Sequence, residues 1–243
     1  MTRIYFSGPL AAGDEVRLPP AQSHHLVHVL RLEAGAHLAL FNGDGAEYAA
    51  VIARIAKNAV YASVQEGHPA ARESPLDVTL AQGISRGERM DYTVQKAVEL
   101  GVARIQPIVT RRAVVRLDAA RAAQRAVHWQ SVATAACEQC GRNRVPEITA
   151  VLTLDDWLAH RRGRGGELGL LLDPEADRGL RDLTRPVGGV ILLAGPEGGL
   201  TDEERHAARQ DGFVAIRLGP RVLRTETAAL AALAALQTLW GDF

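Results

Sequence analysis

The sequence predicts an α/β protein in which a mostly parallel sheet with helices on both faces follows a small β-rich unit. Short strand candidates crowd the first 70 residues, and an aperiodic stretch with two prolines follows them. Beyond residue 75, apolar strand-like runs alternate with segments of helical periodicity, which is the pattern of a parallel sheet. Near the C-terminus, two of these runs each end in a loop that contains glycine. We therefore expect two domains, at residues 1–70 and 71–243.

The N-terminal unit is expected to be a small barrel. A strong hairpin turn, Asn-Gly-Asp-Gly, occupies residues 42–45. The strand candidates are Arg3–Phe6, Glu15–Leu18, His37–Phe41, Tyr48–Ile55 and Val60–Val64.

A helical segment interrupts this unit. Residues 23–32 carry leucine and valine at helical spacing, and Ser23 is the expected cap. The three histidines of the segment have no carboxylate or cysteine nearby that would complete a metal site. No metal is predicted.

The second domain follows a linker that we place at Gly67–Pro75. Its first elements are strands at Leu76–Gln82, Arg104–Val109 and Leu168–Leu172 and helices at about Glu88–Leu100 and Asp118–Cys140. The basic tract at residues 161–166 is more typical of a solvated loop than of an RNA contact.

The last quarter of the chain contains two strand–loop–helix segments. Val190–Ala194 has the composition of a strand covered on both faces. Glycines at 195, 198 and 199 then remove side chains, so a ligand can approach the main chain closely. Thr201 and Glu204 form a capping box, and a helix should start at about residue 202.

The second segment repeats this plan. Phe213–Leu218 is the predicted strand, and Gly-Pro at 219–220 ends it. Thr225 is expected to cap an alanine–leucine helix that runs towards Trp240. Both loops should therefore bind a ligand.

The chemistry of these loops narrows the class of ligand. No Gly-Lys-Ser/Thr motif is present, which excludes a phosphate-binding P-loop. Residues 195–199 lack the Gly-x-Gly-x-x-Gly spacing, and Glu197 would repel a pyrophosphate. A cationic or neutral ligand fits better.

Composition bounds the remaining possibilities. The 243 residues include 28 basic and 28 acidic side chains, so an RNA-binding surface must come from local clustering of charge. No run approaches the roughly 18 apolar residues that span a bilayer, and a cytoplasmic location is expected. Cys137 and Cys140 lack the further ligands of a zinc site and are interpreted as buried or half-buried thiols.

Two sequence blocks together resemble a known family. Gly-Pro-Glu-Gly-Gly-Leu-Thr-x-x-Glu at 195–204 and Leu-Gly-Pro-Arg-Val-Leu-Arg-Thr-Glu-Thr-Ala at 218–228 are similar to the SPOUT class of RNA methyltransferases, and within it to the RsmE type. His-x-x-x-Val-Leu-Arg-Leu at 25–32 and Glu-Gln-x-x-Arg at 138–142 also match. Residues 83–101 match with Arg86 in place of the customary lysine, which keeps the positive charge.

The resemblance implies a SPOUT-type parallel sheet with a C-terminal trefoil knot, preceded by a PUA-like RNA-binding barrel. It implies methylation of uridine N3 in 16S ribosomal RNA by S-adenosylmethionine, with ribosomal RNA or the small ribosomal subunit as partner. The expected cofactor-binding residues are Leu172, Leu193, Ala194, Gly195, Glu197, Gly199, Leu218, Gly219, Val222, Leu223 and Thr225.

Basic residues are the candidates for RNA binding. For a single arginine, a surface salt bridge is as good an explanation as a phosphate contact. Lys96 has a possible ion pair three residues along its helix, with Glu99. The candidates are Arg3, Arg31, Arg86, Lys96 and Arg142.

Arg224 and Glu226 are the candidate catalytic residues. Uridine N3 carries a proton that must leave, and negative charge builds on the uracil oxygens. Arg224 is the favoured electrostatic stabiliser. Glu226 is a weak candidate base, because a helix N-terminus stabilises its charged form, and the base is left unassigned. Alternatively, the two residues pair with each other or across a dimer.

Two other functions and one assembly question stay open. The chain could be a SPOUT methyltransferase acting on transfer RNA, although such enzymes usually lack the N-terminal barrel. It could be a non-catalytic RNA-binding paralogue, although both loop motifs are complete. The last helix is apolar nearly all round, which predicts a homodimer. The alternative is a monomer in which the helix from Asp118 covers the exposed face.

Overall fold

The computed structural model of the chain describes residues 1–57, 59–113, 118–161 and 166–243. Two compact units emerge: unit 1 is Met1–Glu73 with Cys137–Val145, and unit 2 is Ser74–Ala136 with Pro146–Phe243. The break at residues 73 and 74 falls inside the expected linker. The return of residues 137–145 to unit 1 was not foreseen from the sequence.

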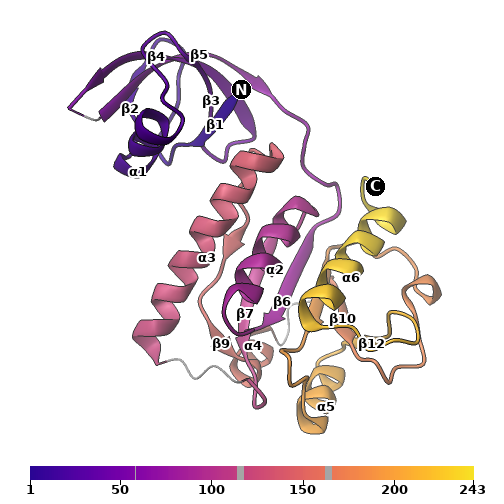
Figure 1. The fold of residues 1–243 in the computed structure, drawn as a ribbon. Coiled ribbons are helices and arrows are strands. Elements are labelled where there is room, and N and C mark those ends of the chain that lie inside the picture. Colours follow the sequence, from indigo (N-terminus) through magenta and orange to yellow (C-terminus); the bar gives the residue numbers. More distant parts are fainter. Residues whose placement is uncertain (58, 114–117, 162–165) are drawn as a thin grey trace. The chain divides into compact units, whose positions relative to one another are not determined.

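Unit 1 is built on one five-stranded sheet (Figure 1). Its order is β1-β3-β4-β5-β2, with β1 and β3 parallel and the other pairs antiparallel. Gly43 and Gly45 both have φ +98°, so the predicted hairpin turn does join β3 to β4. The strands are β1 (Thr2–Tyr5), β2 (Glu15–Arg17), β3 (His37–Phe41), β4 (Ala46–Ala56) and β5 (Ala59–Pro69).

The helical segment of unit 1 begins earlier than expected. Helix α1 (Pro20–His24) has a proline in its first position, where the missing N–H costs nothing, and one π-helical turn (His25–Val29) continues it. Ser23 is therefore not the cap. Its buried hydroxyl donates to the Leu18 carbonyl and accepts from the Val60 N–H, both at 3.1 Å.

Unit 2 is built on a sheet whose strand pairs are all parallel. The order is β12-β10-β11-β6-β7-β8, and β9 also pairs with β7. This confirms the predicted sheet; the trefoil knot stays a prediction. The strands are β6 (Val78–Gly83), β7 (Arg104–Val109), β8 (Glu147–Ile148), β9 (Leu152–Thr153), β10 (Leu168–Leu172), β11 (Val190–Ala194) and β12 (Val214–Ile216).

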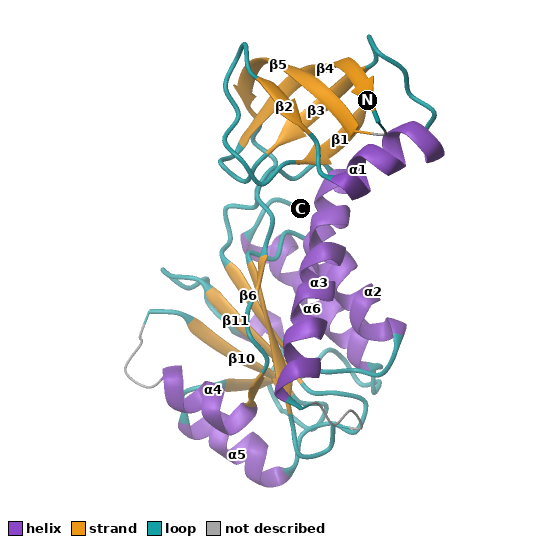
Figure 2. Cartoon of the chain, turned by 90° about the vertical axis from the view of Figure 1, so that its left-hand side faces the viewer, coloured by secondary structure: helices purple, strands orange, loops and turns teal. Residues whose placement is uncertain are grey.

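Helices cover both faces of this sheet (Figure 2). Helices α4 and α5 pack together on one face, and α2 and α6 pack together on the other. The helices are α2 (Glu88–Glu99), α3 (Ala119–Cys140), α4 (Leu154–Arg161), α5 (Asp202–Gln210) and α6 (Thr225–Trp240). The sequence did not predict α4, and residues 162–165 of the basic tract after it lie outside the described residues. No helix in the described part of the chain is long and apolar enough to cross a membrane.

The two cysteines are free thiols. Cys137 is buried and Cys140 half-buried, as expected. Burial raises the pKa of the Cys137 thiol to about 12, so it stays protonated near neutral pH. It is not poised to react as a thiolate.

Replacing Ser23 with alanine should destabilise unit 1 by about 1–3 kcal/mol, because the Val60 amide would lose its buried acceptor. Hydrogen exchange at the Val60 amide measures this directly, and exchange should become faster. Ser131→Ala is the matched control, since that exposed hydroxyl bonds only the Val127 carbonyl of its own helix. Unchanged exchange at Val60 in Ser23→Ala would contradict the assignment.

Candidate functional site

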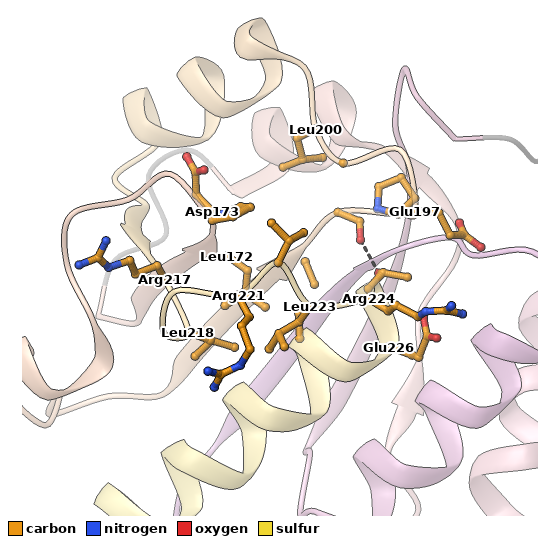
Figure 3. A pocket seen from close by; sticks show the side chains of 18 of the residues that line it. Leu172, Asp173, Glu197, Leu200, Arg217, Leu218, Arg221, Leu223, Arg224 and Glu226 are labelled. Atoms are coloured by element: carbon orange, nitrogen blue, oxygen red, sulfur yellow. Dashed lines mark hydrogen bonds between the residues drawn. The ribbon is translucent and has the colours of Figure 1, made fainter.

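A cavity of about 410 Å³ opens at the carboxyl ends of three neighbouring strands of unit 2 (Figure 3). Leu172, Ala194 and Ile216, the last residues of β10, β11 and β12, line it. The loops at 195–200 and 217–224 supply most of the remaining wall. Ligands of open parallel sheets bind at this edge, and the volume lies in the range of about 300–1,000 Å³ of small-molecule sites.

The loop that follows β11 owes its path to glycine. A Cβ at Gly83, the last residue of β6, would lie 2.5 Å from the backbone nitrogen of Pro196, so the strand packs directly against the loop. Gly199 has φ +68°, and its N–H donates to the Pro196 carbonyl at 2.8 Å. At Gly195 and Gly199 the main chain itself therefore lines the cavity, beside Pro196 and Glu197.

A buried polar chain joins this loop to α6. The Thr225 hydroxyl donates to the Gly195 carbonyl at 2.5 Å and accepts from Gln82 Nε2 at 3.0 Å. Gln82 is fully buried and also donates to the Gly83 carbonyl. The expectation that Thr225 caps its helix is wrong: Arg224 is the N-cap residue, and the threonine hydroxyl is used for the Gly195 contact.

The other end of the loop is held by a buried carboxylate. Glu204 is 2% exposed, and its two oxygens accept the N–H groups of Thr201 and Arg111, both at 2.8 Å. Thr201 Oγ1 accepts from the Glu204 N–H in return, which confirms the predicted capping box. Arg112 Nη1 donates to the carbonyl of Gly198 at 3.4 Å. Glu204 and Arg112 thus connect the turn after β7 to the loop.

Two carboxylates of the cavity each have an oxygen without a donor. Glu197 Oε1 accepts from the Arg86 N–H at 2.9 Å and from Arg89 Nη1 at 3.1 Å. Desolvation alone would raise the pKa of Glu197, but these hydrogen bonds outweigh it and hold the pKa below its ordinary value. Among the described residues, Glu197 Oε2 and Glu226 Oε2 are buried and have no hydrogen-bond partner.

Arg224 and Glu226 both line the cavity. In the view of Figure 3 they lie at the same end of it as Glu197. Within the described residues, Arg224 is exposed and makes no ion pair or side-chain hydrogen bond, so the structure shows no pairing between Arg224 and Glu226. Both side chains therefore remain available to a ligand.

Ten of the eleven expected cofactor-binding residues line the cavity. The exception is Leu193, which is fully buried and packs in the core below α4 and α5. The cavity also includes Asp173, which the sequence analysis missed. Its carboxylate is buried and pairs with Arg209 at 2.8 Å. An aspartate directly after the apolar run at 168–172 is the signal that could have found it.

Two of the expected RNA contacts have structural roles inside unit 1. Arg3 pairs with Glu47 and donates to the Arg142 carbonyl at 3.0 Å. Arg142 is 6% exposed and pairs with Glu73 at 2.7 Å. Both guanidinium groups are engaged by half-buried carboxylates, and RNA contact by these two residues stays a prediction.

The other three expected RNA contacts are partly available. Arg31 and Arg86 are exposed, and Arg31 adopts a positive φ of 53°. Lys96 pairs with Glu99 at 2.7 Å, which is the ion pair that the sequence offered as the alternative to an RNA contact. Arg31 belongs to unit 1, and the other two belong to unit 2.

The fold and the site together define an RNA methyltransferase. The family model described as RNA methyltransferase domain matches residues 72–237, and the one described as RNA methyltransferase PUA domain matches residues 18–65. Ribosomal RNA small subunit methyltransferase E of Buchnera aphidicola is 32% identical over 99% of this chain and 94% of that protein. Its namesake in Bacillus subtilis is 34% identical over 88% of this chain and 86% of that protein.

Solved structures agree with this assignment. Ribosomal RNA small subunit methyltransferase E from Neisseria gonorrhoeae, bound to S-adenosylmethionine, is 40% identical with a TM-score of 0.92 over 100% of this chain and 99% of that one. A methyltransferase from Legionella pneumophila, also with this cofactor bound, is 42% identical with a TM-score of 0.94 over the same shares. The chain belongs to the family of ribosomal RNA small subunit methyltransferase E.

Replacing Glu204 with glutamine should destabilise unit 2 by about 1–3 kcal/mol, because one acceptor oxygen would have to serve two buried N–H donors. Thermal unfolding and hydrogen exchange at the Thr201 and Arg111 amides measure the effect. Glu203→Gln is the matched control on the exposed side of the same turn and should change stability by no more than about 0.5 kcal/mol. A wild-type melting curve for Glu204→Gln would refute this role.

Proposed function

We propose that this chain transfers a methyl group from S-adenosylmethionine to N3 of a uridine in 16S ribosomal RNA, in the cytoplasm. The observation that carries the proposal is the cavity at the ends of β10, β11 and β12, lined by both glycine loops. The relatives named above support the choice of ribosomal RNA. The bound structures support the choice of cofactor.

The cavity fits the proposed cofactor chemically. S-adenosylmethionine carries a positive sulfonium, and Glu197, which pairs with Arg89, and Glu226 place two carboxylates in the cavity wall. Apolar side chains such as Leu172, Leu218 and Leu223 line the same space and suit an adenine ring. Backbone groups of 193–199 and 218–223 would hold the cofactor, which supplies an electrophilic methyl group when it is bound.

Arg224 and Glu226 are the proposed catalytic residues. Uridine N3 must lose its proton as it gains the methyl group, and the negative charge spreads to the uracil oxygens. Arg224, whose guanidinium has no partner among the described residues, would stabilise that charge. Glu226 lines the cavity two residues further along α6, and its carboxylate is the proposed proton acceptor.

The RNA would also contact regions outside the cavity. We propose unit 1 as a PUA-like RNA-binding domain in which exposed Arg31 contacts phosphate. Arg86 is exposed near Glu197 and would contact RNA beside the cavity. Lys96 is a weaker candidate because of its pairing with Glu99.

The function is tested by methylation of small ribosomal subunits from a strain that lacks the corresponding gene. Purified protein and S-adenosylmethionine should convert one uridine to N3-methyluridine, detected by mass spectrometry of nucleosides from 16S ribosomal RNA. Transfer RNA from the same strain is the second substrate. Methylation of transfer RNA alone would favour the transfer RNA alternative, and no methylation of either would favour a non-catalytic paralogue.

Gly199→Val should abolish cofactor binding while the fold remains, because a β-branched residue at φ +68° would shift the loop. Isothermal titration with S-adenosylmethionine measures it. Gly212→Val is the matched control: Gly212 has φ +88° and equally open surroundings, but it does not line the cavity. Wild-type affinity in Gly199→Val, or equal loss in both variants, would contradict the proposed binding mode.

Arg224→Ala should reduce turnover far more than cofactor affinity, because the guanidinium is proposed to act on charge that develops in the uracil. Single-turnover rates at saturating RNA, together with titration of the cofactor, separate the two effects. Arg224→Lys keeps the charge and should recover part of the rate. A wild-type rate for Arg224→Ala would remove this residue from the catalytic site.

We propose a homodimer that forms through α6. Helix α2 packs against one side of α6. In the alternative without a dimer, α3 was expected to cover the exposed face of this helix. Leu239 of α6 is 43% exposed, and Val222 just before the helix is 82% exposed. These exposed apolar side chains, one before the start of α6 and one near its end, support a second subunit against the helix.

Static light scattering should give a mass of about twice the 26.1 kDa of the chain. Leu239→Glu should shift this mass towards the monomer, because it places a charge on the exposed face of α6. Thr238→Glu, at the exposed neighbouring position, tests how far the interface extends. A fully active wild-type protein at 26.1 kDa would show that no dimer is needed.

A further inference from the structure

We propose that unit 2 carries its own binding surface for the RNA phosphodiester backbone, formed by four arginines at the mouth of the cavity. This inference rests on the proposed function, which supplies RNA as the substrate. None of its residues is among the expected RNA contacts: Arg178 and Arg217 lie outside both loop motifs, Arg221 lies within the second motif, and Arg224 is also the proposed catalytic residue. We call them the rim arginines: Arg178, Arg217, Arg221 and Arg224.

The rim arginines concentrate positive charge on a chain with no net charge. Three of them lie within the eight residues 217–224, and residues 217–225 contain no acidic side chain. The fourth is adjacent in space, because the Arg217 N–H donates to the Arg178 carbonyl at 2.8 Å. Asp177 can offset at most one of the four charges. A local excess of this kind attracts polyanions.

No described residue forms an ion pair with these charges. In the part of the chain that the structure describes, the four side chains are exposed and make no ion pair or side-chain hydrogen bond. The other arginines of the cavity are engaged: Arg89 pairs with Glu197, Arg205 pairs with Asp173, and Arg112 donates to loop carbonyls. A guanidinium group without a protein partner can bind phosphate bidentately, because no existing ion pair has to break first.

The loop presents these side chains from a defined backbone. Gly219 has φ +72° and Pro220 follows it, so the turn is restricted, and Thr225 holds its far end to Gly195. In Figure 3, the side chains of Arg217 and Arg221 extend outward from the wall of the cavity. Outward arginines at the mouth suit a strand of RNA that passes over the cavity and places one unstacked base in it.

The competing anion is the carboxylate of the cofactor itself, which one arginine would suffice to bind. Four separate cations along an open edge fit a chain of phosphates better than one carboxylate. The two possibilities differ in what they change: phosphate contacts set RNA affinity and its salt dependence, whereas a carboxylate contact sets the affinity for S-adenosylmethionine.

The test uses Arg217→Gln and Arg221→Gln, singly and together, in the full chain. Binding of a fluorescein-labelled oligouridylate is followed by anisotropy over a range of salt. Each substitution should weaken binding and lower the slope of log affinity against log salt by about 0.7, as for one phosphate contact to a single strand. The KM for RNA should rise while affinity for S-adenosylmethionine and the light-scattering mass stay unchanged.

Arg104→Gln is the matched control. Arg104 is an exposed arginine at the amino end of β7, which is the opposite edge of the same sheet, and it should leave the RNA salt slope unaltered. Unchanged RNA affinity and slope in the double variant would overturn the proposal. So would weakened binding of S-adenosylmethionine, which would assign the arginines to its carboxylate, or an altered mass, which would assign them to a subunit interface.

Failure of the proposed function would look different. A wild-type protein that binds oligouridylate through Arg217 and Arg221 but methylates no ribosomal RNA would keep the surface and refute the function. Normal methylation by the wild-type protein, with no effect of either substitution on RNA binding, would keep the proposed function and refute the proposed surface.

Discussion

The site depends on the hydrogen bonds of one buried hydroxyl, that of Thr225. It accepts from Gln82 and donates to Gly195, and so joins the end of β6, the loop after β11 and the start of α6. A single hydrogen bond contributes only about 0.5–1.5 kcal/mol to the free energy of unfolding. The larger effect of the two Thr225 hydrogen bonds is geometric, because they fix the start of α6, with Arg224 and Glu226, against the loop that forms the cavity wall.

The glycine loop is held at both ends by groups of this kind. Thr225 holds Gly195 at its beginning, and Glu204 and Arg112 hold its end to the turn after β7. Between these points, main-chain atoms of the glycines line the cavity together with Pro196 and Glu197. Among the described residues, Glu197 and Glu226 each keep a buried oxygen without a donor in the cavity wall, whereas Arg217, Arg221 and Arg224 line the cavity without an ion pair.

Periodicity and motifs predicted the order of strands and helices, the capping box at Thr201 and both loops of the cavity, because these signals are local. Contacts between distant residues were not predictable in this way. Thr225 was interpreted as a cap because its partners, Gly195 and Gln82, lie 30 and 143 residues away in the sequence. For Arg3 the sequence left a salt bridge and a phosphate contact as equal alternatives, because Glu47 comes beside it only in the folded unit. Strands β8 and β9 have two residues each, too few to show a period.

The central claim is that Thr225 connects the two loops into one cofactor site, and titration calorimetry with S-adenosylmethionine tests it most directly. Thr225→Val keeps the shape and removes the hydroxyl, whereas Thr225→Ser keeps the hydroxyl. The account predicts near wild-type affinity for the serine variant and a large loss for the valine variant, with both proteins folded. Wild-type affinity in Thr225→Val would contradict it.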